Sequence, residues 1–244
     1  MHGAQDNPEG RPSVRFSKRA YARYRARIVM LRKLGIEPGE GRIFFWSAAA
    51  LFLLGWTDVS FKNVAETFFS KRVGVEYYPW AFLASSLLLV GTTLLFGRLT
   101  TRRDRLWLLP RTFFVLGILL LPLWFMVRAE TPGIYATLLI VQKQLTSISL
   151  IAFWVALGDL LHGRQAKRLF APMMAGLTVG TILGSLASGP IGAWLGIDAL
   201  LPLSTLTIMA AGVVPLPLRK LRPSFVPLSE PPVAAERPAE VDGE

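Results

Sequence analysis

The sequence predicts an all-α membrane protein with six transmembrane helices. Of its 244 residues 52% are hydrophobic, the mean hydropathy is +0.43, and the charged residues gather between long apolar runs. In a soluble protein a net charge of +11 would suggest a nucleic-acid partner. Here the cations crowd the connections between apolar runs, as membrane topology requires, and no nucleic-acid-binding motif accompanies them. We therefore expect a lipid bilayer, and no nucleic acid, as the surroundings of this chain.

Six apolar runs are of about the length needed to cross a hydrocarbon core of about 30 Å, which takes about 20 residues. They cover residues 43–69, 80–96, 106–127, 134–161, 169–193 and 197–216. A polar and basic stretch precedes the first run, so we expect that run to be a permanent span and not a cleavable signal peptide. The sequence thus predicts a six-helix transmembrane domain over residues 42–217.

Two polar segments flank this domain. In residues 1–41, Arg and Lys alternate with apolar residues such as Phe16, Tyr21 and Ile28, which is typical of a basic helix lying on an anionic membrane surface. A solvated basic tail without a lipid role explains the same pattern equally well. Residues 218–244 become Pro-rich and acidic after Arg222, and we interpret them as a disordered cytoplasmic tail or linker.

The distribution of cations predicts the orientation. Twenty-one Lys and Arg residues lie before the first run, in or next to the second and fourth connections, and directly after the sixth run up to Arg222. The other connections hold three, which are Lys71, Arg72 and Arg128. Since Lys and Arg are retained on the cytoplasmic side, both termini are expected in the cytoplasm.

Three charged residues interrupt the first run. Asp58, Lys62 and Glu66 follow one another at four-residue steps, which keeps them on one helix face. An isolated charge near the bilayer centre costs about 2.5–3.5 kcal/mol on insertion scales, so these charges need partners or water. Two interpretations remain open: a ladder within the helix in which Lys62 satisfies both acids, or the lining of a cavity for a charged solute or a proton.

The fourth run has polar residues near its middle. Gln142, Lys143 and Gln144 lie about 14 Å along the helix from the start of this run, close to the bilayer midplane. An uncompensated lysine there would be expensive, so we expect Lys143 to meet Asp58 or Glu66, or to face a wet cavity. An ion pair that only locks two helices together is the structural alternative.

Small residues repeat every four positions in the fifth run. They are Gly176, Gly180, Gly184, Ser188 and Gly192. Such a repeat lets two helices approach closely, and in a bilayer this packing takes the place of the hydrophobic effect. We expect it to serve helix packing.

Several site classes have no support in the sequence. There is no cysteine, and the two histidines are too few for a zinc site. No motif of a nucleophilic, metal-dependent or phosphate-binding enzyme is present, so we expect neither catalysis nor a cofactor.

Two stretches resemble known transporters. Residues 163–170, GRQAKRLF, follow a run containing Phe153 and Trp154 and precede a glycine-rich one, and they resemble the bacterial and plastid ATP/ADP translocases. Residues 96–103, FGRLTTRR, resemble the signature between the second and third helices of the major facilitator superfamily. The resemblance covers residues 42–216, one six-helix half of a twelve-helix carrier, and implies half of a major-facilitator-type fold in a bacterial cytoplasmic (inner) membrane.

The resemblance also implies a function and a site. It implies alternating access around a midplane solute site, with a second six-helix half or a second copy of the chain as partner. Lys62 and Glu66 stand where the translocases have an arginine and an aspartate, whereas Ala65 and Gln142 stand where they have a lysine and an acid. We therefore expect part of a secondary transporter for a charged or polar solute, such as a nucleotide. The predicted solute-binding residues are Asp58, Lys62, Glu66, Gln142 and Lys143. The alternative is a membrane scaffold or sensor module that does not transport.

Overall fold

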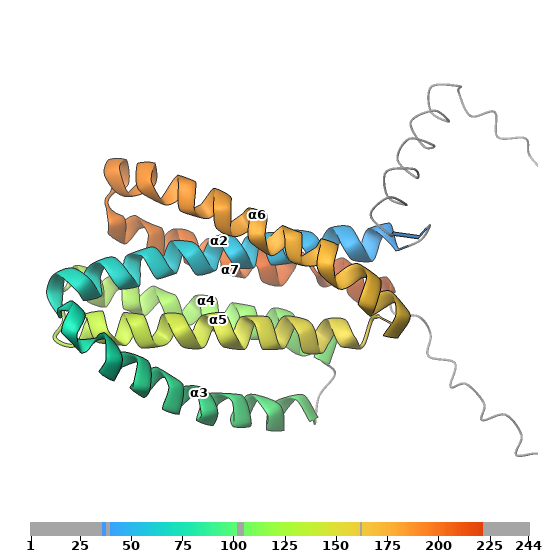
Figure 1. Cartoon of the computed structure of the whole chain (residues 1–244), viewed down its shortest axis with the longest axis horizontal. Coiled ribbons are helices and arrows are strands. Elements are labelled where there is room, and N and C mark those ends of the chain that lie inside the picture. The colour runs from blue at the N-terminus through green and yellow to red at the C-terminus, as the bar shows by residue number, and fades with distance from the viewer. Residues whose placement is uncertain (1–35, 38–39, 102–104, 162, 222–244) are drawn as a thin grey trace, which may run out of the picture.

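The computed structural model describes residues 36–37, 40–101, 105–161 and 163–221, and within these ranges the chain is helical without a strand (Figure 1). Its long helices are α2 (Gly41–Arg72), α3 (Tyr78–Thr101), α4 (Arg105–Arg128), α5 (Ile134–Gly158), α6 (Gly163–Leu195) and α7 (Leu200–Val213). Short 3-10 helices are η1 (Val75–Tyr77), η2 (Ile197–Ala199) and η3 (Leu216–Leu221). The predicted interfacial helix and the greater part of the predicted tail lie outside the described residues.

Six helical stretches are long and apolar enough to cross a membrane, judged by length and composition. They are Gly41–Arg72, Val75–Thr100, Arg105–Arg128, Ile134–Gly158, Gly163–Leu195 and Ile197–Leu218. The predicted class, an all-α multi-pass membrane protein with six spans, is confirmed. Several helices extend past the apolar runs, because a helix can continue into the polar interface where hydropathy no longer marks it. The start of α6 at Gly163, in a basic stretch, is the clearest case.

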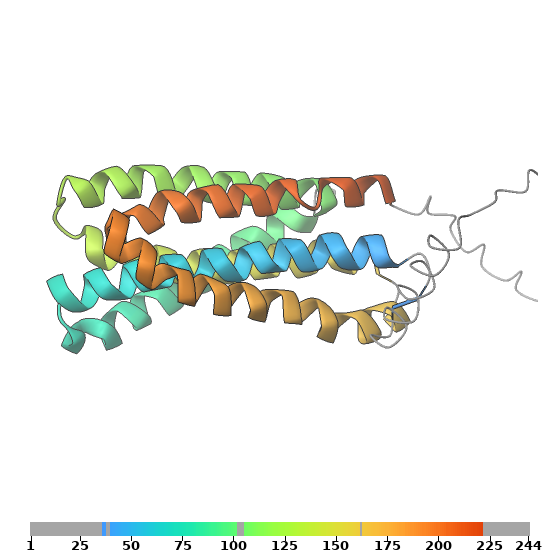
Figure 2. The same ribbon diagram turned by 90° about the horizontal axis from the view of Figure 1, so that it is seen from above.

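Helix α2 lies at the centre of the bundle, where it packs against α5, α6 and α7 (Figures 1 and 2). On one side α4 joins α5 and α7, and α3 packs against α5 at the edge. Large apolar side chains fill the space between the helices, and Phe61, Phe69, Phe113 and Phe153 are almost completely buried. Helix α2 thus has neighbours on several sides, whereas α3 exposes most of its apolar surface.

Glycines bring α2 and α6 into close contact. A Cβ atom on Gly176 would meet the backbone of Ala48, and one on Gly180 would overlap the carbonyl group of Phe52. One turn further, a Cβ atom on Gly184 would reach the side chain of Val59. The predicted role of the small-residue repeat in packing is confirmed over these three glycines, since they allow backbone-to-backbone contact.

The antiparallel helices place the connections at two ends of the bundle. The start of α2, the end of α5, the start of α6 and the end of the α7–η3 segment lie on the right of Figure 1. Arg168 binds both Glu37 and Glu40 at this end, and its Nη2 is 2.7 Å from each oxygen of the Glu40 carboxylate. Here Arg105 also pairs with Asp159 at 3.1 Å.

At the opposite end, two ion pairs tie the connections to one another. Arg72, the last residue of α2, lies 3.0 Å from Glu130 in the α4–α5 connection. Arg128, the last residue of α4, lies 3.2 Å from Asp198 in η2. Both pairs are partly exposed, so each contributes only about 0–1 kcal/mol.

A labelling experiment tests the orientation. A cysteine replacing Glu130 should react with an impermeant maleimide from outside intact cells, and one replacing Gln165 only after the cytoplasmic face is opened. The basis is the retention of Arg-rich connections on the cytoplasmic side. The chain has no cysteine of its own, so each signal reports on one position. Reaction of both cysteines from the same side would contradict the topology.

Candidate functional site

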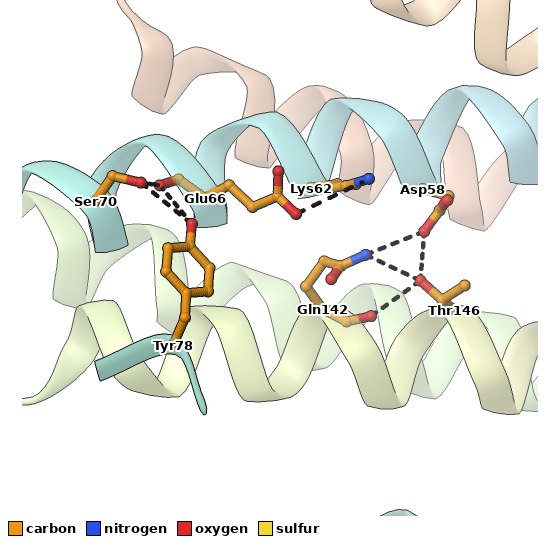
Figure 3. A network of polar contacts seen from close by, with 7 residues as sticks. All are labelled: Asp58, Lys62, Glu66, Ser70, Tyr78, Gln142 and Thr146. Atoms are coloured by element: carbon orange, nitrogen blue, oxygen red, sulfur yellow. Dashed lines mark hydrogen bonds and ion pairs between the residues drawn. The ribbon is translucent and has the colours of Figure 1, made fainter. Parts of the chain in front are cut away.

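Polar side chains from α2 and α5 meet in the interior of the bundle (Figure 3). Asp58 lies near the middle of α2 and is half-buried. Across from it on α5, the Nε2 group of Gln142 donates a hydrogen bond to Asp58 Oδ1 at 3.1 Å. The hydroxyl of Thr146, one turn after Gln142, donates a short hydrogen bond to the same oxygen. Two neutral dipoles therefore hold the carboxylate.

The same two residues of α5 also bind one another. The Nε2 group of Gln142 is 3.1 Å from Thr146 Oγ1, so its two N–H groups serve Asp58 and Thr146 together. This fixes the direction of the amide, and it leaves Gln142 Oε1 buried without a hydrogen-bond partner among the described residues. A buried polar atom left unpaired is costly, which is typical of a functional position.

Lys62 pairs with one acid of the stripe and not with the other. Its Nζ lies 3.9 Å from Glu66 Oε1, and the two side chains are 45% and 35% exposed. Of the two ion pairs expected within the helix, Lys62–Glu66 is formed and Lys62–Asp58 is not. The hydrogen-bond partners of Asp58 lie on α5. In Figure 3 the Lys62 ammonium lies between Glu66 and Asp58 along α2, and its ion pair is with Glu66.

The outer part of the stripe has further polar contacts. The backbone carbonyl of Glu66 accepts hydrogen bonds from Ser70 Oγ at 2.7 Å and from Tyr78 OH at 3.3 Å. The two hydroxyls lie 3.1 Å apart (Figure 3). These bonds attach the start of α3 to the end of α2, which is a structural role.

Lys143 does not form the expected ion pair. No carboxylate of the described residues lies within 4.0 Å of its ammonium group, which instead sits over the ring of Phe82 on α3, 5.1 Å from the ring centroid. The reason is helical geometry: one residue along α5 turns the side chain by about 100°, away from the α2 side that Gln142 faces. The ring compensates the charge in part through a cation–π contact.

Gln144 serves structure. Its Oε1 accepts a hydrogen bond from Thr92 Oγ1 at 2.8 Å, and its Nε2 donates to the backbone carbonyl of Ser85 at 2.7 Å. Both partners lie on α3, so this buried amide fastens α3 to α5. Gln142 thus contacts α2, whereas Lys143 and Gln144 contact different residues of α3.

A small cavity adjoins the Asp58 cluster between α2, α5 and α6. Its volume is about 50 Å³, and its lining is Leu54, Asp58, Leu145, Thr146, Ser149, Leu150, Leu177 and Thr181. The sequence analysis missed Thr146, Ser149 and Thr181 as candidate site residues. For two of them a signal existed, because Thr146 and Ser149 follow Gln142 at steps of four and three residues and share its helix face. Nothing in the sequence pointed to Thr181.

Four of the five predicted residues form two separate pairs, Asp58 with Gln142 and Lys62 with Glu66. They do not meet in one cluster. Lys143 lies apart on the α3 side. Within the described residues no three His, Cys, Asp or Glu side chains are grouped so that they could hold a metal ion. No family model, no curated protein and no solved structure matches the chain.

Proposed function

We propose that this chain is part of a secondary transporter for a charged or polar solute, working by alternating access as one six-helix half of a carrier. The observation that carries the proposal is the half-exposed ionic stripe of Lys62 and Glu66 on the central helix, continued inward by Asp58. Charged groups kept within a membrane-crossing helix are costly and mark solute and ion pathways. A nucleotide is one solute whose phosphates the lysines would attract.

Each of the two lysines, which lie in separate places, offers an ammonium group to an anionic part of a solute. Lys62 is 45% exposed and has one distant carboxylate partner, and Lys143 rests on an aromatic ring. Neither ammonium group is held by a short ion pair among the described residues. Each therefore keeps hydrogen-bond donors for a solute, since a lysine ammonium has three.

Two poorly covered helices support a partner for this half. In the most apolar window of α3 only 6% of the residues are buried, and in that of α6 22%, against 44% in each of the other four spans. Helix α3 packs on α5 and α6 packs on α2, so they flank the two helices that carry the polar residues. A second six-helix half, or a second copy of this chain, that packs on α3 and α6 would enclose the polar residues of α2 and α5. The proposal puts the end of the bundle with the start of α2 and the end of α7 in the cytoplasm, and the membrane is then the inner membrane of a bacterium.

Uptake into proteoliposomes tests the proposal. The purified chain, alone and together with any six-helix protein encoded beside it, is offered labelled nucleotides, inorganic phosphate, and a panel of organic acids and amines. Saturable uptake of one solute above that of protein-free vesicles is expected. Uptake of none of these by either preparation would favour the scaffold or sensor module over a transporter.

A further inference from the structure

The cavity beside Asp58 has the size of an ion site. Its volume of about 50 Å³ compares with about 10–15 Å³ for the smallest cavity that holds one water, and with about 300 Å³ for the smallest pockets of organic ligands. It has room for a small ion with a water or two, and none for a nucleotide. The lining combines four leucines with four residues that carry oxygen, which are Asp58, Thr146, Ser149 and Thr181.

Two of these residues bring unused hydrogen-bonding capacity to the cavity lining. The hydroxyl of Ser149, a residue only 2% exposed, is buried with no hydrogen-bond partner among the described residues. Both bonds to the Asp58 carboxylate end on Oδ1, so Oδ2 receives none from this part of the chain. A buried hydroxyl normally has a partner, and a cation bound to its lone pair would give the Ser149 oxygen one here.

The other two hydroxyl oxygens keep lone pairs to different extents. Thr181 Oγ1 donates its proton to the backbone carbonyl of Leu177 at 3.0 Å, which leaves its lone pairs available. Thr146 Oγ1 donates to Asp58 Oδ1, accepts from Gln142 Nε2 and lies 3.0 Å from the backbone carbonyl of Gln142, so one lone pair remains for an ion. The four oxygens come from three helices, so an ion between them would bridge α2, α5 and α6.

No ammonium or guanidinium group of the described residues lies within 4.0 Å of the Asp58 carboxylate. Lys62 and Glu66, on the same helix, pair with each other, and Lys143 sits over Phe82. Helix α7 and the part of α6 after Arg168 carry no titratable side chain. The direct partners of the carboxylate are therefore dipoles, and a half-buried charge in a membrane-crossing helix gains from a counter-ion in contact with it.

We propose that Asp58, Thr146, Ser149 and Thr181 form a binding site for Na⁺. Hard oxygen ligands suit alkali and alkaline-earth cations. With a single carboxylate, a monovalent ion leaves the site neutral, whereas a divalent ion would leave a net positive charge in a medium of low dielectric constant. A proton would need only the free oxygen of Asp58 and would leave Ser149 unsatisfied. In the transport proposed above, this ion would be the coupling ion. That role depends on the proposed function, whereas binding of Na⁺ to the site does not depend on it.

Thermal unfolding of the purified full chain in detergent tests the site. We compare NaCl, KCl and choline chloride at equal ionic strength. Na⁺ should raise the unfolding temperature in a saturable way, since a ligand that binds the folded state stabilises it, and K⁺ and choline should not. Asp58→Asn should lose the response to Na⁺, and Ser149→Ala should raise the half-saturating concentration about five- to tenfold. Asp159→Asn, which changes a carboxylate at the end of α5, should respond like the wild type.

Three results would overturn the site. The first is equal unfolding temperatures in the three salts, and the second is an undiminished Na⁺ response in Asp58→Asn. The third is stabilisation on lowering the pH in choline chloride with no added effect of Na⁺, which would assign a proton to Asp58. If Asp58→Asn does not fold, Thr181→Val keeps the side-chain shape, removes one ligand and should weaken Na⁺ binding. Direct binding of radioactive sodium to the wild type is independent of uptake, so the ion site and the transport proposal can fail separately.

Discussion

Replacing Lys62 and Lys143 together with alanine should reduce solute uptake to the level of protein-free vesicles. The two ammonium groups are positive charges within membrane-crossing helices, and neither is consumed by a short ion pair among the described residues. Their removal takes away the groups proposed to attract the charged part of the solute. The measurement is the initial rate of uptake in proteoliposomes, with the amount of reconstituted protein determined in the same vesicles.

The fold should survive this double change. The Lys62–Glu66 pair is long and nearly half exposed, so its loss costs at most about 1 kcal/mol. A matched control replaces Lys71 and Lys167, two exposed lysines at helix ends, with alanine and should transport normally. Wild-type uptake in the Lys62→Ala/Lys143→Ala protein would refute the assignment of these lysines.

The change Gly180→Ala should destabilise the bundle strongly. The added Cβ would overlap the carbonyl oxygen of Phe52 and lie 2.8 Å from its carbon and 3.0 Å from the Cα. These are backbone atoms that cannot rotate away, so α2 and α6 would have to separate. We expect the free energy of unfolding to fall by about 2 kcal/mol or more, measured as a lower unfolding temperature in detergent.

The matched control lies on the same helix. Gly189 is exposed, and no atom lies within 4 Å of where its Cβ would be, so Gly189→Ala should unfold like the wild type. Equal unfolding temperatures for Gly180→Ala and Gly189→Ala would mean that the close contact between α2 and α6 does not stabilise the fold.

The fold class was predictable because membrane insertion depends on local composition. An apolar run of the right length becomes a helix whatever its neighbours are, since every backbone group must be satisfied within the segment. The role of the glycine repeat of α6 in helix packing was also predictable, because contact between two helix backbones requires small residues on whichever helix is the partner. That α2 is the partner was not predictable, since no local pattern names the helix on the other side of a contact.

The candidate site was predictable only as far as single helices allow. The Asp58–Lys62–Glu66 stripe follows from spacing on α2, and the Lys62–Glu66 pair formed as such spacing permits. Of the two alternatives expected for Lys143, the ion pair with Asp58 or Glu66 is not formed, because pairing across helices depends on how α5 is rotated about its axis, and the wet cavity stays a prediction. With Gln142 turned toward Asp58, Lys143 is turned toward Phe82, and that rotation is set by packing over the whole helix.

The ion pairs at the two ends have a mechanical consequence. Arg168 joins the beginnings of α2 and α6, Arg105 joins α4 to the end of α5, and the opposite end is bridged through Arg72 and Arg128. Each bridge is weak alone, but together with the interior packing they resist sliding of any of these helices past its neighbours. In the transport that we propose, the six helices would therefore move as one body, without bending between their two ends.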